Sequence, residues 1–410
     1  MPEVTESKGV VSLFSGAGGL DAGLEQAGFT TLLAIDNDPD SVATLAAAKK
    51  RRLPVDANRC YLQDATIVEA DLTKLTKAKL LELWGQDTAP AVLAGGPPCQ
   101  SFSSAGRMRG IEDERGRLFL DFVRAARALK PEFVVFENVQ GLVTARDSDG
   151  NVGGVLTLVR DAFEKAGYAC SFALVNAADY GTPQRRVRLV MVGSRRHPLP
   201  GFPPAPTHSR EGGNGSLLTP WVSLREALAD VAEPTGADVV RPGDALAAKL
   251  AEVGPGSGIR VGGRVENNRP GGHWGYRQDG FVADWDQPSR TIRSATTPDW
   301  LRLEDGSHRR LTWWECARLQ GFPEEWAFQG TVTSRFRQVG NAVPVQLAHA
   351  LGGAVAAALD AGPLPRGIKP QSAEWPASFR RRIRYTKAEQ RVNGPLRRRR
   401  EDAAPSPMAA

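Results

Sequence analysis

The chain has 410 residues, 41% hydrophobic and 24% charged, with a formal net charge of +6, a composition typical of a globular protein. Its length exceeds the usual size of one hydrophobic core, so we expect two domains with additional segments. No stretch approaches the ~18 apolar residues of a membrane span, and the first residues do not resemble a secretory signal, so we expect a cytoplasmic protein outside the membrane.

The sequence between Gly9 and Gly193 alternates short apolar runs with stretches of helical length. The runs are GVVSLF, TTLLAID, PAVLAG, PEFVVFENV and RVRLVMVG. This alternation predicts parallel strands joined by crossover helices. We therefore expect a doubly wound, Rossmann-like α/β domain over residues 1–196.

The composition of the sequence changes at residue 197, where glycine, proline and polar residues become frequent. We expect a smaller, loop-rich domain over residues 197–290. A helical pattern returns near Thr312 and predicts that residues 291–360 rejoin the first domain, with Pro344 in the first turn of the last helix.

Residues 361–410 hold 12 Lys/Arg against 4 Asp/Glu. Their local net charge of 12 − 4 = +8 exceeds the +6 of the whole chain. The preceding 360 residues are therefore slightly acidic. A segment of this composition is typical of a basic, flexible tail.

The segment FSGAGGLDAG follows the first apolar run and opens a helix, where a glycine turn lets a ligand approach the backbone. A dinucleotide fingerprint starting at Gly16 would need a glycine where the chain has Asp21, which argues against a nicotinamide cofactor. Asp36 ends the second run, and Asp71 follows a third segment, so two carboxylates suit a ribose and an adenine edge. Taken singly, these residues are more often turn glycines and helix-capping aspartates, but together on one edge they favour a ligand site.

Four cysteines are too widely spaced for a disulfide framework or a zinc site, so we expect free thiols. Cys99 follows Pro97 and Pro98 just beyond the run AVLAG, where α/β folds gather ligands. The prolines restrict the backbone and hold the thiol in one direction. Cys99 is our candidate nucleophile, and a small buried side chain is the alternative.

Charged side chains follow two further apolar runs. Glu137 comes after four apolar residues, and its burial would raise the carboxyl pKa enough to carry a proton near neutral pH. In QRRVRLVMVG, alternation places Arg186 and Arg188 on one side of a strand, where they could bind an anion or a carbonyl oxygen. A salt bridge and a solvated strand entrance are the alternatives.

Six motifs occur together and in order: FSGAGGL, GGPPCQSFS, FENV, QRRVR, LTWWECARLQGFP and RQVGNAVP. By these motifs the chain resembles the bacterial-type DNA (cytosine-5) methyltransferases over about residues 9–358. The resemblance implies methyl transfer from S-adenosylmethionine to carbon 5 of a cytosine flipped out of double-stranded DNA. Cys99 would add to carbon 6, Glu137 would bind the N3 and N4 edge, and Arg188 with Arg186 would contact O2 and a nearby phosphate.

The resemblance also implies a cofactor pocket and a target recognition domain within residues 197–290. Phe14 would stack on adenine, Asp36 would hold the ribose and Asp71 the adenine amino group. The expected cofactor-binding residues are Phe14, Gly16, Gly18, Leu20, Asp36, Asp71, Pro97, Asn341 and Val343. The expected DNA-reading residues are Arg260, Arg264, Asn267, Asn268, Arg269, His273, Trp274, Arg277 and Gln278.

Two other functions remain open from the sequence: methylation of cytosine in tRNA, and DNA binding without catalysis. Serines at 101 and 103 after the Pro-Pro-Cys-Gln motif and the long insertion favour DNA over tRNA. We expect no metal, a monomer, and a functional pairing with a restriction endonuclease. The basic tail is expected to attract phosphates without sequence preference.

Overall fold

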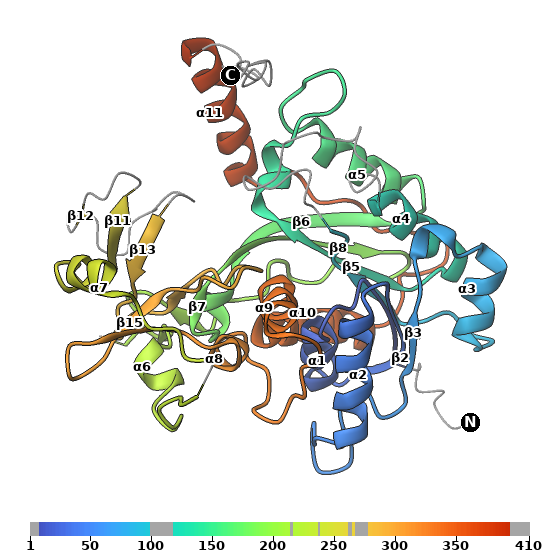
Figure 1. The fold of residues 1–410 in the computed structure, drawn as a ribbon. Coiled ribbons are helices and arrows are strands. Elements are labelled where there is room, and N and C mark those ends of the chain that lie inside the picture. The colour runs from blue at the N-terminus through green and yellow to red at the C-terminus, as the bar shows by residue number, and fades with distance from the viewer. Residues whose placement is uncertain are drawn as a thin grey trace, which may run out of the picture.

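The computed structural model describes residues 8–98, 118–213, 216–236, 238–260, 265–266 and 278–393. The larger part of the protein is built on a seven-stranded sheet in the order β3-β2-β1-β4-β5-β8-β6 (Figure 1). Its strands are β1 (Gly9–Leu13), β2 (Thr30–Asp36), β3 (Thr66–Glu69), β4 (Val92–Gly95), β5 (Phe133–Val139), β6 (Ala169–Asn176) and β8 (Val187–Ser194). β3, β2, β1, β4 and β5 are parallel, and β8 is antiparallel to β5 and β6. The predicted doubly wound, Rossmann-like fold is confirmed.

Helices cover both faces of this sheet (Figure 1). In β5, Val134 and Phe136 pack towards one face and Phe133 and Val135 towards the other, as the two-residue period of a strand requires. The first face carries α3 (Lys77–Trp84), α4 (Leu118–Leu129) and α5 (Gly154–Glu164). The second carries α1 (Gly19–Gln26), α2 (Pro39–Arg51) and α10 (Val345–Asp360).

The strand order reverses at β1, because β2 lies on one side of it and β4 on the other. In open α/β sheets, ligands bind outside the carboxyl ends of the strands at such a switch point. We call this side of the sheet the carboxyl edge. It receives the residues that directly follow β1, β2, β3, β4 and β5.

α10 packs along α1 with almost no side chain between the two helices. A Cβ at Gly23 would lie 2.3 Å from the Cβ of Ala348 and 2.4 Å from the carbonyl oxygen of Val345. α10 follows α9 (Val332–Asn341) after a short break at Pro344. The segment 332–360 is long and apolar enough to cross a membrane by composition, but most of its apolar window is buried, so it belongs to the core.

The second part of the chain contains a five-stranded sheet in the order β12-β11-β13-β15-β16. Its strands are β11 (Ser257–Arg260), β12 (Val265–Glu266), β13 (Gln278–Val282), β15 (Trp300–Arg302) and β16 (His308–Arg310). β15 and β16 lie beyond the predicted boundary at residue 290, because β13 pairs with β15 across the intervening loop. The smaller elements between β6 and β15 are η5 (Ala177–Tyr180), β7 (Gln184–Arg185), β9 (His208–Ser209), β10 (Thr219–Pro220), α6 (Leu224–Ala227), α7 (Asp244–Ala251) and β14 (Ser289–Arg290).

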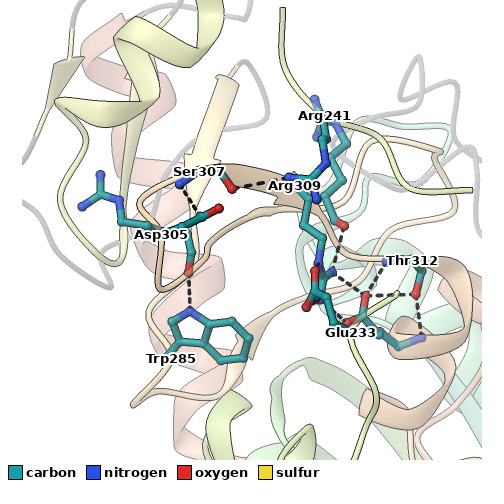
Figure 2. A network of polar contacts seen from close by, with 10 residues as sticks. Glu233, Arg241, Trp285, Asp305, Ser307, Arg309 and Thr312 are labelled. Atoms are coloured by element: carbon teal, nitrogen blue, oxygen red, sulfur yellow. Dashed lines mark hydrogen bonds and ion pairs between the residues drawn. The ribbon is translucent and has the colours of Figure 1, made fainter. Parts of the chain in front are cut away.

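A buried arginine joins this second sheet to α8 (Trp313–Leu319) (Figure 2). Arg309 donates hydrogen bonds of 2.9 Å to both carboxylate oxygens of Glu315, and its Nε donates to Glu233 at 2.7 Å. Glu315 also accepts from the backbone nitrogen of Thr312 and so caps α8. The carboxylate of Glu315 therefore compensates a buried guanidinium and a helix terminus together.

The C-terminal segment differs from the predicted flexible tail as far as residue 393. Ser372 and Ala373 hydrogen-bond to the backbone of Cys170 at the edge of β6, and a helix follows, α11 (Ala377–Asn393). Phe379 is fully buried in the core of the seven-stranded sheet, and Trp375 packs against the ring of Phe172. The apolar side chains that anchor this segment are few and stand among arginines, so composition concealed them.

Candidate active site at the carboxyl edge

The loop after β1 is held in a tight left-handed turn. Phe14, Gly16 and Gly18 have φ angles of 54°, 55° and 86°, a backbone region that favours glycine. The backbone nitrogen of Gly16 donates to Oδ2 of Asp36 at 2.8 Å, and that of Ser15 donates to the carbonyl of Ile35 at 3.2 Å. The end of β2 therefore fixes the shape of the glycine loop.

Asp36 and Asp71 both lie at the carboxyl edge, as predicted from their places after strands. Asp36 also accepts from the backbone nitrogen of Asp38 at 2.8 Å, and burial raises the pKa of its carboxyl group. Asp71 caps the short helix η1 (Leu72–Lys74) through the backbone and hydroxyl of Thr73, and these hydrogen bonds lower its pKa. Each carboxylate thus shapes its own loop, and Asp71 is the more exposed of the two.

The segment between α9 and α10 comes back to the glycine loop from the far end of the sequence. A Cβ at Gly19 would lie 2.3 Å from the carbonyl oxygen of Val343, so the two backbones touch. Leu20 and Val343 are buried in one cluster, and Asn341, two residues before Val343, is exposed. The structure thus brings Val343 against the start of α1, directly after the glycine loop.

Trp326 is a neighbour of the glycine loop that sequence reasoning missed. Its indole nitrogen donates to the carbonyl oxygen of Ala17 at 2.9 Å. A Cβ at Gly18 would come within 3.1 Å of its ring. A single tryptophan in a loop carries no periodic signal, so only the tertiary structure shows that it supports this turn.

Gly96 and Pro97, directly after β4, lie beside Glu137 and Asn138 of β5. A Cβ at Gly96 would stand 2.7 Å from Oε2 of Glu137, and the side chain of Asn138 donates to the carbonyl oxygen of Pro97 at 3.3 Å. Cys99, two residues beyond Pro97, lies outside the described residues. The chain thus approaches Glu137 immediately before the candidate nucleophile.

Glu137 forms an ion pair with Arg188, whose Nε lies 2.9 Å from Oε1. The pair spans the antiparallel strands β5 and β8 diagonally, since Val139 is directly opposite Arg188. Both side chains are nearly buried, at 11% and 12% exposure. Burial raises the pKa of Glu137, and the positive charges of Arg188 and Arg186 partly oppose that rise.

Arg186 differs from its predicted role as a contact to the base and a phosphate. The side chain is buried, and its terminal nitrogens donate to the carbonyl oxygens of Ile292 and Gly340, each at 2.8 Å. Gln184 reinforces this junction by accepting from the backbone nitrogen of Ile292 at 2.9 Å. Arg186 therefore ties the entrance of β8 to the end of α9, next to Asn341.

The other predicted residues can be placed only in part. Arg260 and Gln278 belong to β11 and β13, whereas Arg264, Asn267, Asn268, Arg269, His273, Trp274 and Arg277 lie outside the described residues. Cys170 and Cys316 are buried free thiols, and burial raises the pKa of Cys170 to about 12. Neither suits a nucleophile. The described part of the chain contains no group of His, Cys, Asp and Glu side chains that could hold a metal ion.

This sheet order, with a glycine turn after β1 and carboxylates after β2 and β3, defines a Rossmann-like methyltransferase fold. The model of the C-5 cytosine-specific DNA methylase family matches residues 9–357. The chain belongs to this family and is a DNA (cytosine-5) methyltransferase.

The chain is similar to the Type II methyltransferase M.SacI of Streptomyces achromogenes, with 32% identity over 362 residues, covering 82% of this chain and 90% of the relative. It is 33% identical over 374 residues to the Type II methyltransferase M.PspPI of a Psychrobacter strain, covering 88% and 82%. The solved structure of the Entamoeba histolytica methyltransferase EhMeth has the same fold, with a TM-score of 0.59 and 15% identity over 86% of this chain and 98% of that one.

Proposed function

We propose that this chain transfers the methyl group of S-adenosylmethionine to carbon 5 of a cytosine flipped out of a specific sequence in duplex DNA, through a transient bond from Cys99. The observation that carries this proposal is the buried Glu137–Arg188 pair lying against Gly96, three residues before Cys99. An acid of raised pKa and a fixed guanidinium at one place suit a ring that gains negative charge.

The carboxyl edge suits S-adenosylmethionine as the methyl donor. Gly16 has no atom within 4 Å of where a Cβ would stand, so the turn leaves room for a ligand close to the backbone. Phe14, Asp36 and Asp71 would hold the adenosine part, and Asn341 with Val343 the methionine part. Bound there, S-adenosylmethionine would supply an electrophilic methyl group.

The protein's own groups would make carbon 5 reactive. The thiolate of Cys99 would form a bond to carbon 6, which moves an electron pair towards carbon 5 and N3. Glu137 would hold a proton at N3, and Arg188 would stabilise charge on O2. When carbon 5 has been methylated, loss of its proton to solvent and expulsion of the thiolate restore the ring.

Methylation of a plasmid in cells, followed by bisulfite sequencing, tests the function and identifies the target sequence together. With the wild-type chain, we expect one cytosine within one short sequence to be fully protected from bisulfite conversion. With Cys99→Ser, we expect no protection. Cys60→Ser is the matched control, because Cys60 is a free, partly exposed thiol in a separate loop, and it should methylate normally.

Purified protein separates the alternatives. Labelled methyl groups entering tRNA and not duplex DNA would replace the proposal by RNA methylation. DNA binding without transfer, identical in wild type and Cys99→Ser, would indicate a binding module. An oligonucleotide with 5-fluorocytosine at the target position should trap a covalent adduct with wild type and none with Cys99→Ser.

The names of the two curated relatives also support a biological setting. Both are Type II methyltransferases, so we propose that this chain acts beside a restriction endonuclease of the same target sequence. Cells that express such an endonuclease should survive only when the wild-type chain is also present, and this result would support the pairing.

A further inference from the structure

We propose that α11 is a second DNA-binding element, which holds the phosphate backbone of the duplex outside the target sequence. The inference rests on the proposed function, because it takes duplex DNA as the substrate. It concerns residues beyond the family match, which ends at residue 357.

α11 is fixed to the rest of the protein at its first turns. Phe379 is fully buried, and Ile383, one turn later, lies over Gly153, where a Cβ would come within 2.8 Å of Ile383 Cδ1. Trp375, just before the helix, packs against Phe172 of β6 and beneath the guanidinium of Arg160. A helix held by these contacts is a defined part of the fold.

The anchoring point is close in the chain to the candidate active site. η4 (Gln140–Thr144) directly follows β5, which carries Glu137, and α11 rests on η4 and on the turn before α5. From there α11 projects away from the sheet (Figure 1). With 17 residues it is about 25 Å long, enough to pass several phosphates of a duplex.

One side of α11, next to the side that carries its anchors, is basic. Arg380, Arg384 and Lys387 are exposed and stand three or four residues apart, and Arg381 stands three residues before Arg384, so the four share this side of the helix. The ion pair of Arg380 with Glu374, at 3.7 Å, is exposed and weak. Arg382 is exposed on another side of the helix.

The charge distribution favours DNA as the occupant. Residues 1–360 are slightly acidic, so the net positive charge of the chain comes from the C-terminal segment. Lysine and arginine that neutralise phosphates release counterions, which strengthens binding most at low salt. A projecting basic helix beside the candidate active site can supply this attraction without any base contact.

The test uses the full chain with Arg381→Gln, Arg384→Gln and Lys387→Gln combined. Binding to a fluorescein-labelled 30-base-pair duplex is measured over a salt series. We expect the slope of log affinity against log salt to fall by about 2 to 3, because each lost phosphate contact contributes about 0.9. At low salt the affinity should fall at least tenfold, and the KM for plasmid DNA should rise in parallel.

Two further variants separate charge from folding. The double variant Arg381→Lys, Arg384→Lys keeps every charge and should keep the wild-type slope. The control Lys50→Gln, Arg51→Gln, Lys165→Gln removes three exposed charges at or just after the C-terminal ends of α2 and α5, at the opposite edge of the sheet, and should also keep it.

If the wild-type chain methylates plasmid DNA and the triple variant keeps the wild-type salt slope, the inference is overturned and the proposed function stays intact. The same loss in the control variant also overturns it. A loss confined to tRNA binding would assign α11 to RNA. A wild-type chain that neither binds nor methylates DNA would refute the proposed function, and this inference with it.

Discussion

Glu137 is the residue on which the proposed chemistry depends most directly among those described. Its carboxyl group is buried, its pKa is raised by that burial, and it faces both Arg188 and the turn that leads to Cys99. A carboxylate whose only role was to neutralise Arg188 would serve stability alone. Substitution with an isosteric amide distinguishes the two roles.

Glu137→Gln should lower kcat by about 100-fold or more, because the amide cannot exchange a proton with the ring. Glu132→Gln is the matched control. Glu132 also forms an ion pair with an arginine, Arg196, and lies one residue before β5 at the opposite end of the strand. Methylation kinetics at equal folded fraction check this prediction, and equal losses in both variants would contradict it.

Asp21 shows a different effect of burial on a carboxyl group. It is fully buried in the first turn of α1, and desolvation raises its pKa to about 6, although the nearby hydroxyl of Ser12 favours the ionised form. The folded protein therefore holds this proton more tightly than the unfolded chain. The free energy of unfolding must fall as pH rises from about 4 to 6, where the folded protein loses the proton.

Asp21→Asn removes this titration. Relative to wild type, the variant should gain about 2 kcal/mol in free energy of unfolding between pH 4.5 and 7.5. Urea unfolding at the two pH values measures it. If the difference in free energy of unfolding between variant and wild type is the same at both pH values, the pKa of Asp21 is not raised in the folded protein.

At the scale of elements, the contact between α1 and α10 decides whether the two ends of the chain form one pocket. Gly23 lets α1 approach α10 until backbone touches backbone, and Gly19 allows the same approach to Val343 just before α10. This approach sets Val343 and Asn341 beside the glycine loop. A side chain inserted at this contact would separate the two halves of the expected cofactor site.

Gly23→Ala should destabilise the protein by about 1–3 kcal/mol and weaken binding of S-adenosylmethionine, because its Cβ would overlap Val345 and Ala348. Gly353→Ala is the control within α10. No atom lies within 4 Å of the place that its Cβ would take, so it should stabilise by about 0.5–1 kcal/mol. Thermal unfolding and titration with S-adenosylmethionine provide the measurements, and similar effects of both changes would exclude the close contact.

At the scale of the whole molecule, residues 363–393 extend the catalytic domain beyond the family match. They cover the edge of β6 through Ser372 and Ala373 and place Phe379 in the main core. Removal of residues 361–410 would therefore expose core surface in addition to removing positive charge. Variants of single side chains are the sharper test.

Phe379→Ala should lower the free energy of unfolding by about 3–5 kcal/mol, since it leaves a large cavity in a closely packed core. Tyr385→Ala on the same helix should change it by less than about 0.5 kcal/mol, because that ring is 64% exposed. Chemical denaturation of the full chain checks both values. A small effect at Phe379 would indicate that the segment is only loosely attached.

The amino-acid sequence by itself determined the doubly wound fold and the places of Asp36, Asp71, Pro97 and Glu137 at or near the carboxyl ends of strands. These features depend on local periodicity and on the rule that parallel strands carry ligands at their carboxyl ends. The family followed from six motifs in order, and the family match confirmed it.

Only the tertiary structure decided what Arg186, Trp326 and Phe379 do. Arg186 reaches partners 106 and 154 residues away, and Trp326 reaches Ala17 across 309 residues. Such contacts leave no period in the sequence, because they depend on which elements the folded sheet brings together. For the same reason the second sheet continues past residue 290 and the basic C-terminal segment forms an anchored helix.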